Sequence, residues 1–124
     1  IGLMYSLERN MQLNTNSLQV DIINKARMRI RETLEKKVTI QDISQEMGIS
    51  YSNFRKLFKE YTGVAPATYQ DALRLQRAKE LLSITDESIK EIAYKLNFES
   101  PDYFPSKFKL KTGYKPSDFR ALSR

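Results

Sequence analysis

A run of hydrogen-bonding side chains lies opposite a run of large apolar ones in the middle of the chain. Phe54, Leu57, Phe58 and Tyr61 recur at steps of three and four, which predicts the buried face of a helix. The opposite face then carries polar residues, namely Ser52, Asn53, Arg55, Lys56 and Lys59. Arginine and lysine can bind guanine O6 and N7 or a phosphate, and asparagine can pair with adenine. An ordinary amphipathic helix with a solvated charged face would give the same pattern, so these residues alone do not decide between the two readings.

An internal repeat favours the first reading. Residues 39–69 and 88–119 carry the same spaced residues, at an offset of 49 that becomes 50 after a turn near residues 48–53. The first copy has Thr39, Ile40, Asp42, Ile43, Met47, Phe54, Phe58, Lys59, Gly63, Pro66 and Tyr69. The second has Ser88, Ile89, Glu91, Ile92, Leu96, Phe104, Phe108, Lys109, Gly113, Pro116 and Phe119. Each copy reads as helix, tight turn, helix, Gly, Pro and helix, which is typical of a helix-turn-helix unit whose second helix can enter a major groove.

The elements that would position these side chains are all helical. Apolar residues recur with helical spacing and no strand-like alternation is present, so we predict an all-α fold of about seven helices. Two tandem helix-turn-helix subdomains, 20–64 and 84–124, are joined by a long linker helix at 65–83. Residues 1–19 are interpreted as a linker or the tail of a missing upstream domain, with a frayed helix over 3–12 as an option and the first regular helix starting at Asp21.

Composition narrows the class of function. Lys plus Arg number 21 and Asp plus Glu 15, giving a net charge of +6, which favours a polyanionic partner but also fits a basic solvated surface. The chain contains no His and no Cys, so zinc fingers, cysteine nucleophiles and histidine relays are excluded. We therefore expect no enzyme activity, metal or cofactor. No membrane-length apolar stretch or signal peptide is visible, and we expect a cytoplasmic protein.

The spaced residues of the second copy resemble the DNA-binding domain of the AraC/XylS family of bacterial transcription regulators. The matching residues are Ile89, Ile92, Ala93, Phe98, Ser100, Tyr103, Phe104, Phe108, Lys109, Gly113, Pro116, Phe119 and Arg120. The segment 74–82 also matches the family's linker helix, and the resemblance covers about residues 21–122.

The resemblance implies seven helices and two helix-turn-helix units that read adjacent major grooves. It also implies transcription activation through RNA polymerase and a sensory or signalling domain elsewhere in the full protein. Carried over by position, the DNA contacts would be Ser52, Asn53, Arg55 and Lys56 in the first unit and Pro101, Asp102, Tyr103 and Ser106 in the second. The helix starts at Thr39 and Ser88 would meet phosphates.

The second copy departs from the family at three positions. Asn97 replaces a usual Gly, and Asn tolerates the left-handed conformation of the turn. Ser106 replaces a frequent Arg, and Pro105 would cost a backbone hydrogen bond deep inside a helix. We therefore predict either a late helix start, with Asp102 as the cap, or a local kink. Either would re-aim Lys107 so that it could replace the missing Arg, while Asp102 is expected to cap the helix rather than accept from a cytosine amino group.

Two other interpretations remain at this stage. A helical protein-interaction module could use the same amphipathic helices to dock a partner, through an exposed apolar groove and with salt-insensitive binding. Basic residues outside the reader helices need not touch DNA, and we expect Arg74 and Arg77 to pack or to pair with nearby acids.

Overall fold

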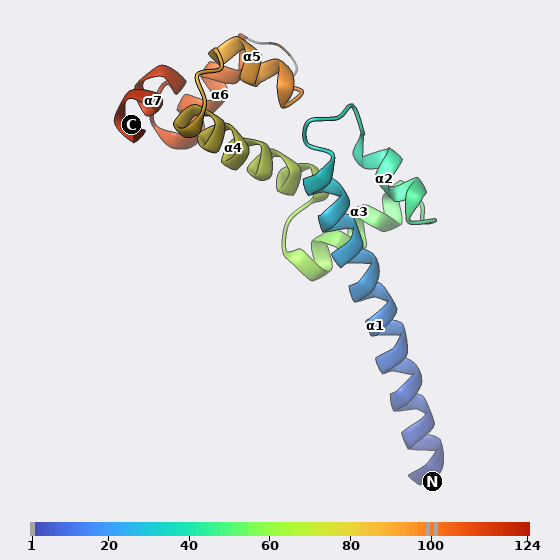
Figure 1. Ribbon diagram of the computed structural model, residues 1–124. Helices are drawn as coiled ribbons and strands as arrows, with labels where there is room; N and C mark the ends of the chain where they lie inside the picture. The colour runs from blue at the N-terminus through green and yellow to red at the C-terminus, as the bar shows by residue number, and fades with distance from the viewer. Residues whose placement is uncertain (1, 99, 101) are drawn as a thin grey trace. The chain divides into compact units, whose positions relative to one another are not determined.

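The computed structural model describes residues 2–98, 100 and 102–124, with side chains described from residue 17 onward. This part of the chain is all-α and contains seven helices, with no strand among the described residues (Figure 1). The helices are α1 (Gly2–Glu32), α2 (Ile40–Glu46), α3 (Tyr51–Thr62), α4 (Pro66–Ile84), α5 (Ile89–Lys95), α6 (Tyr103–Thr112) and α7 (Pro116–Ser123). The predicted all-α fold of about seven helices is confirmed.

The chain forms two compact units. The first comprises Ile1–Ile30 and Thr39–Pro66, and the second comprises Arg31–Val38 and Ala67–Arg124. The helix expected to act as a linker between two subdomains, α4, therefore belongs almost entirely to the second unit. The short segment 31–38, which precedes α2 in the chain, also belongs to the second unit.

The first unit is built on α1, α2 and α3. Its buried apolar residues are Ile23, Ala26, Ile30, Ile40, Ile43, Phe54 and Phe58. Of the buried face predicted for α3, Phe54 and Phe58 are fully buried, whereas Leu57 is only half-buried. Tyr61 was expected to be buried as well, but it is 38% exposed and its hydroxyl donates a hydrogen bond to Gln19 Oε1 at 2.8 Å. The phenol lies near the end of α3, where its polar tip can reach α1 instead of the core.

Helix α1 starts earlier than the apolar pattern indicated. A helix beginning at Asp21 was expected, whereas α1 runs without interruption from Gly2 to Glu32. Apolar periodicity marks only the part of a helix that packs, so the pattern could not reveal the preceding turns.

The second unit has its own core, formed by α4, α5, α6 and α7. Its buried cluster contains Ala78, Leu81, Leu82, Ile92, Ala93, Leu96, Phe104 and Phe108, with Leu75, Ile89, Phe98 and Phe119 packed against it. Aromatic rings run through this core in sequence. Phe98 stacks on Phe104 at a centroid distance of 4.7 Å, and Phe108 makes edge-to-face contacts with Phe104 at 5.7 Å and with Phe119 at 5.4 Å.

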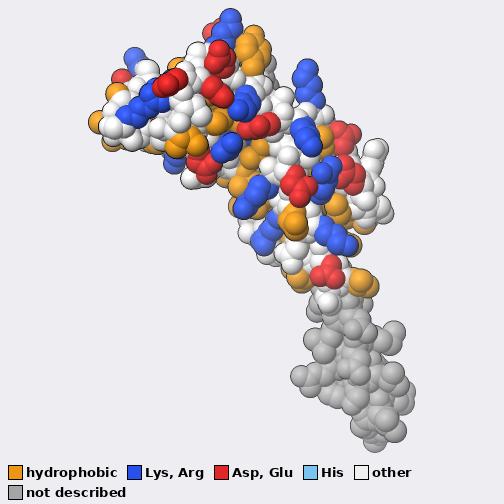
Figure 2. Space-filling view, viewed as in Figure 1, with side chains coloured by type: hydrophobic (Ala, Val, Ile, Leu, Met, Phe, Trp, Pro, Cys, Tyr) orange, Lys and Arg blue, Asp and Glu red, His pale blue; other side chains and the backbone are white. Residues whose placement is uncertain are grey.

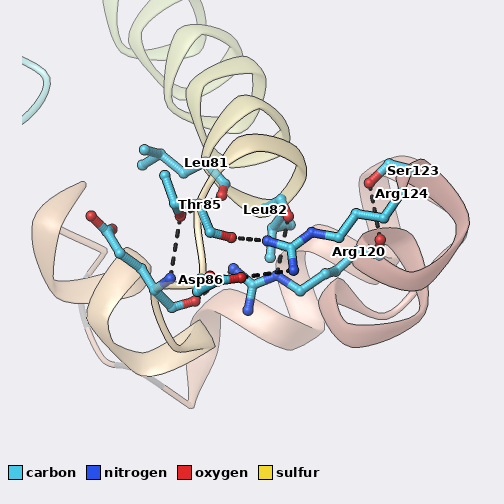
Figure 3. A network of polar contacts seen from close by, with 8 residues as sticks. Leu81, Leu82, Thr85, Asp86, Arg120, Ser123 and Arg124 are labelled. Atoms are coloured by element: carbon cyan, nitrogen blue, oxygen red, sulfur yellow. Dashed lines mark hydrogen bonds and ion pairs between the residues drawn. The ribbon is translucent and has the colours of Figure 1, made fainter.

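Two arginines near the C-terminus fix α7 to the end of α4 (Figure 3). Arg120 Nε donates to the carbonyl of Leu82 at 3.1 Å, and its Nη2 donates to the carbonyl of Glu87. Arg124 pairs with Asp86 at 2.9 Å and also donates to the carbonyl of Thr85 (Figure 3). The bond to Leu82 satisfies a carbonyl group that the last turn of α4 leaves free, and the other bonds attach the C-terminal end of the chain to the loop between α4 and α5.

Candidate nucleic-acid interface

The first reader helix, α3, is defined at both ends by its own sequence. Ser50 Oγ accepts a hydrogen bond from the backbone N–H of Asn53 at 3.2 Å, which caps the helix start. Gly63 ends it with a left-handed φ of +84°, a conformation that costs glycine little. Phe54 and Phe58 are fully buried, so the rotation of α3 about its axis is fixed.

That rotation turns the predicted polar residues outward. Ser52, Asn53, Arg55, Lys56 and Lys59 are all exposed, and none of the three basic residues forms an ion pair with any described residue. The guanidinium of Arg55 lies over the ring of Tyr51, 5.6 Å from its centroid, which restricts the arginine without using its hydrogen-bond donors on an acid. The outer face of α3 therefore offers a set of free donors on a rigid helix.

Helix α2 precedes α3 and is held by two sets of interactions. Thr39 and Asp42 form the predicted capping box, with Thr39 Oγ1 accepting from Asp42 N at 3.0 Å and Asp42 Oδ2 accepting from Thr39 N at 2.9 Å. At the other end, Arg29 of α1 donates to both carboxylate oxygens of Glu46, at 2.7 and 2.8 Å. This bidentate pair keeps the pKa of the Glu46 carboxyl below its ordinary value, chiefly through the hydrogen bond from Arg29.

The same capping box recurs at α5. Ser88 Oγ accepts from Glu91 N and Glu91 Oε2 accepts from Ser88 N, both at 3.0 Å. Because an acidic side chain stands at the first turn of both α2 and α5, a phosphate there would be bound through the hydroxyl protons of Thr39 and Ser88 rather than through their backbone N–H groups.

The two helix-turn-helix turns have the same backbone hydrogen bonds despite different residues. In the first, Gly48 N donates to the carbonyl of Gln45 and Ile49 N to that of Ser44. In the second, Asn97 N donates to the carbonyl of Tyr94 and Phe98 N to that of Ala93. Gly48 has φ +73° and Asn97 has φ +59°, so the expected left-handed asparagine is confirmed.

The side chain of Asn97 has a role that the pattern did not reveal. Its Nδ2 donates to the carbonyl of Leu34 at 3.1 Å and to the carbonyl of Lys36 at 2.9 Å. Asn97 thereby attaches the segment 31–38 to the turn between α5 and α6 within the second unit. A glycine at this position could adopt the same backbone conformation but could not form these bonds.

Helix α6 starts late, which was one of the two alternatives predicted from Pro105; the other was a local kink. The regular helix begins at Tyr103, so Pro105 is its third residue, where no intrahelical donor is needed. The expected cap is wrong, however, because Asp102 has a right-handed backbone and its side chain forms no capping bond. Ser100 supplies the acceptors instead: its Oγ and its carbonyl both accept from Tyr103 N at 3.1 Å.

The proposed contact residues of α6 lie in different surroundings. Asp102, Tyr103 and Ser106 are exposed, whereas Pro101 lies outside the described residues. Lys107 is turned toward α4, where its Nζ pairs with Asp71 Oδ2 at 3.1 Å and lies 5.7 Å from the centroid of the Tyr103 ring. To contact a phosphate, Lys107 would have to leave this ion pair.

Two lysines that were not among the predicted DNA contacts, Lys109 and Lys115, lie in α6 and at the start of α7. A cleft of about 280 Å³ is lined by Ile89, Pro105, Ser106, Lys109, Lys115, Pro116 and Ser117. Lys109 could have been found from the repeat, since it matches Lys59, but Lys115 has no basic counterpart in the first copy.

The remaining charges are mixed rather than gathered in one patch. On the face shown in Figure 2, lysine and arginine side chains are interspersed with aspartate and glutamate. Arg74 pairs with Asp71 at 3.4 Å, and Arg77 pairs with Glu80 at 2.9 Å and with Glu35 at 3.5 Å, which confirms the expectation for these two arginines. Glu80 is the main reason that the pKa of Arg77 is raised.

Neither a membrane span nor a metal site is found in the described part of the chain. No helix there is long and apolar enough to cross a bilayer. No group of three or more His, Cys, Asp or Glu residues there could hold a metal ion.

Comparison with known proteins places this geometry in a known class. The fold resembles the DNA-binding domain of the global transcriptional factor AdpA in complex with a target DNA, with a TM-score of 0.76 and 25% identity over 82% of this chain and 92% of that one. A family described as "Helix-turn-helix domain" matches residues 43–122. The fold and the exposed helix face therefore define a helix-turn-helix DNA-binding domain.

The particular family follows from the same matches: the chain belongs to the AraC-type helix-turn-helix DNA-binding domains, which are not enzymes. It is 33% identical to the TetD protein of transposon Tn10 from Escherichia coli, over 90% of this chain and 82% of that protein. It is 29% identical to the transcriptional activator RhaS of Salmonella schwarzengrund, over 73% of this chain. The aligned region is 33% of the length of RhaS.

Proposed function

We propose that the chain binds a specific double-stranded DNA sequence as the output domain of a bacterial transcription regulator. The observation that carries the proposal is the outer face of α3, where Asn53, Arg55 and Lys56 are exposed and the two basic residues are unpaired among the described residues. Side chains of these types can hydrogen-bond to base edges in a major groove, and a rigid, capped helix presents them with little loss of conformational entropy.

In this proposal α3 and α6 enter successive major-groove segments of one DNA molecule, about 34 Å apart. Arg55 and Lys56 discriminate between bases, assisted by Ser52 and Asn53, while Lys59 contacts phosphate. In the second unit, Asp102, Tyr103, Ser106 and Lys107 face the DNA. Thr39 and Ser88 bind phosphates at the starts of α2 and α5.

The wider role also belongs to the proposal. RhaS, whose length exceeds the matched region about threefold, is named a transcriptional activator. We therefore infer that this domain works in the cytoplasm with a sensory or signalling domain in the same protein, and that it activates transcription through contact with RNA polymerase. Salt dependence should be steep, because phosphate contacts release counterions.

The test begins with selection of an operator from a random-oligonucleotide pool. Binding is then measured for the operator and for a scrambled duplex, with the wild-type chain and with Arg55→Ala. We expect the substitution to reduce the preference for the operator by about 1–3 kcal/mol, at one sub-site only, because a bidentate base contact is lost.

Lys25→Ala is the matched control, since Lys25 is an exposed basic residue of the first unit outside α3. It removes one positive charge and should leave the preference for the operator unchanged. Equal affinity of the wild-type chain for operator and scrambled DNA would overturn the proposed function.

A further inference from the structure

The two copies of the repeat distribute their positive charge differently. At an offset of 50 residues, Arg55 and Lys56 on α3 correspond to Pro105 and Ser106 on α6. The second reader helix therefore has no positive charge at these two positions, while Lys107 and Lys111 stand where the first copy has Leu57 and Tyr61. Pro105 cannot donate any hydrogen bond from its ring, so this part of α6 has little capacity to read bases.

The second copy also gains a positive charge at the next element. Ala65 and Ala67, which flank the proline that starts α4, correspond to Lys115 and Ser117, which flank the proline that starts α7. One lysine and one hydroxyl thus appear at the beginning of α7. Lys59 is retained as Lys109.

The fold brings these residues together. Ser106 and Lys109 from α6 and Lys115 and Ser117 from the start of α7 line one cleft of about 280 Å³. All four residues are exposed, and neither lysine has an ion-pair partner within the described ranges. No acidic residue lines the cleft, although the exposed Asp118 follows Ser117 in the first turn of α7. Two ammonium groups and two hydroxyl groups around one concave surface suit a phosphate group.

We propose that this cleft binds a phosphate of the DNA backbone, and that the second unit holds the duplex through this contact rather than through base readout by α6. The inference rests on the proposed function and specifies how the second unit takes part in it. Phosphate contacts fix the register of a protein on DNA without carrying sequence information. The first unit then supplies most of the discrimination and the second supplies affinity and orientation.

The test compares Lys115→Ala and Lys109→Ala with Lys111→Ala as the matched control. Lys111 is an exposed lysine of the same helix as Lys109, but it lines a different cavity, next to Asp71. Affinity for the selected operator and for a scrambled duplex is measured over a range of salt concentrations. Each cleft substitution should weaken binding to both duplexes by the same factor and reduce the slope of log affinity against log salt, by at most about 0.9, the value for one phosphate contact. Lys111→Ala should leave the slope unchanged. Lys115→Arg keeps the positive charge and should therefore have the wild-type slope, unlike Lys115→Ala.

Two results would overturn the proposal. One is a wild-type slope for both cleft variants, which would mean that neither lysine meets a phosphate. The other is a loss of operator binding with scrambled binding intact, which would make these lysines base readers. If the wild-type chain binds DNA without sequence preference, the proposed function fails, while the slope on scrambled DNA still tests the cleft. If it binds no DNA, both fail. Thermal unfolding followed by circular dichroism verifies that each variant is folded.

Discussion

Asn97 combines a left-handed backbone with a side chain that hydrogen-bonds to two distant carbonyl groups. The backbone conformation closes the turn before α6, and the amide holds Leu34 and Lys36. Substitution of Asn97 by glycine or by alanine separates the backbone contribution from that of the side-chain amide. Asn97→Gly keeps the favourable backbone and removes the amide, whereas Asn97→Ala removes the amide and adds strain at positive φ.

We expect Asn97→Gly to lower the free energy of unfolding by about 1–2 kcal/mol, because two hydrogen bonds are lost. Asn97→Ala should lower it by roughly 1 kcal/mol more, because of the left-handed conformation. Chemical denaturation of the three proteins measures both differences. A glycine variant as stable as the wild type would show that the amide contacts contribute nothing.

The backbone role of Asn97 could be predicted from the sequence, whereas its amide partners could not. Tolerance of positive φ is a local property of asparagine, and the repeat places Asn97 opposite Gly48. Its partners lie 63 and 61 residues earlier in the chain, and no local pattern indicates them. Lys107 is similar: it was expected to be re-aimed so that it could replace the missing Arg, but the acid that binds it, Asp71, comes from another helix.

At the scale of single elements, the start of α6 shows how one proline changes a helix. In α3 the N–H of Arg55 is at the position that bonds to the carbonyl four residues earlier, but Pro105 has no such donor. In α6 the proline is the third residue, and Tyr103 N bonds to the carbonyl of Ser100, three residues earlier, as in a 3₁₀ turn. The late start could be predicted, because proline has no backbone N–H and is tolerated in the first turn of a helix but not in its interior.

The choice of cap was not predictable, because Ser100 and Asp102 are both good capping residues. The structure leads to a clear expectation for stability. Ser100→Ala should destabilise the chain by about 0.5–1 kcal/mol, since it removes the hydroxyl that accepts from Tyr103 N and leaves only the Ser100 carbonyl. Asp102→Ala should have a much smaller effect, because the Asp102 side chain makes no capping bond.

Thermal and chemical unfolding of these two variants measures the difference. A larger loss in Asp102→Ala than in Ser100→Ala would contradict this assignment of the cap. DNA binding by Asp102→Ala provides a separate readout, because Asp102 is exposed and can still contact a base.

At the scale of the whole molecule, each unit has its own buried aromatic pair. Phe54 and Phe58 belong to the first unit, while Phe104 and Phe108 belong to the second. The repeat predicted this division, since the same two positions in each copy are apolar. It did not predict that α4 would join the second unit, because a helix with apolar residues on several sides can pack against either neighbour.

We expect the two cores to respond separately to cavity formation. Phe108→Ala should destabilise the second unit by about 3–5 kcal/mol, because a fully buried ring is removed. Amide hydrogen exchange should then rise in α5, α6 and α7, and much less in α2 and α3. Phe58→Ala is the matched variant and should give the opposite pattern. A uniform rise along the chain in either variant would indicate one cooperative unit instead.

The attachment of residues 31–38 to the second unit has a consequence for protein synthesis. These residues leave the ribosome before residues 39–66 of the first unit, but their partner Asn97 is made much later. The first unit can therefore fold as soon as its last residue emerges, while the carbonyls of Leu34 and Lys36 wait for the rest of the chain. The interval between these two events is set by translation, so the bonds from Asn97 to the segment 31–38 form only after the turn between α5 and α6 has been made.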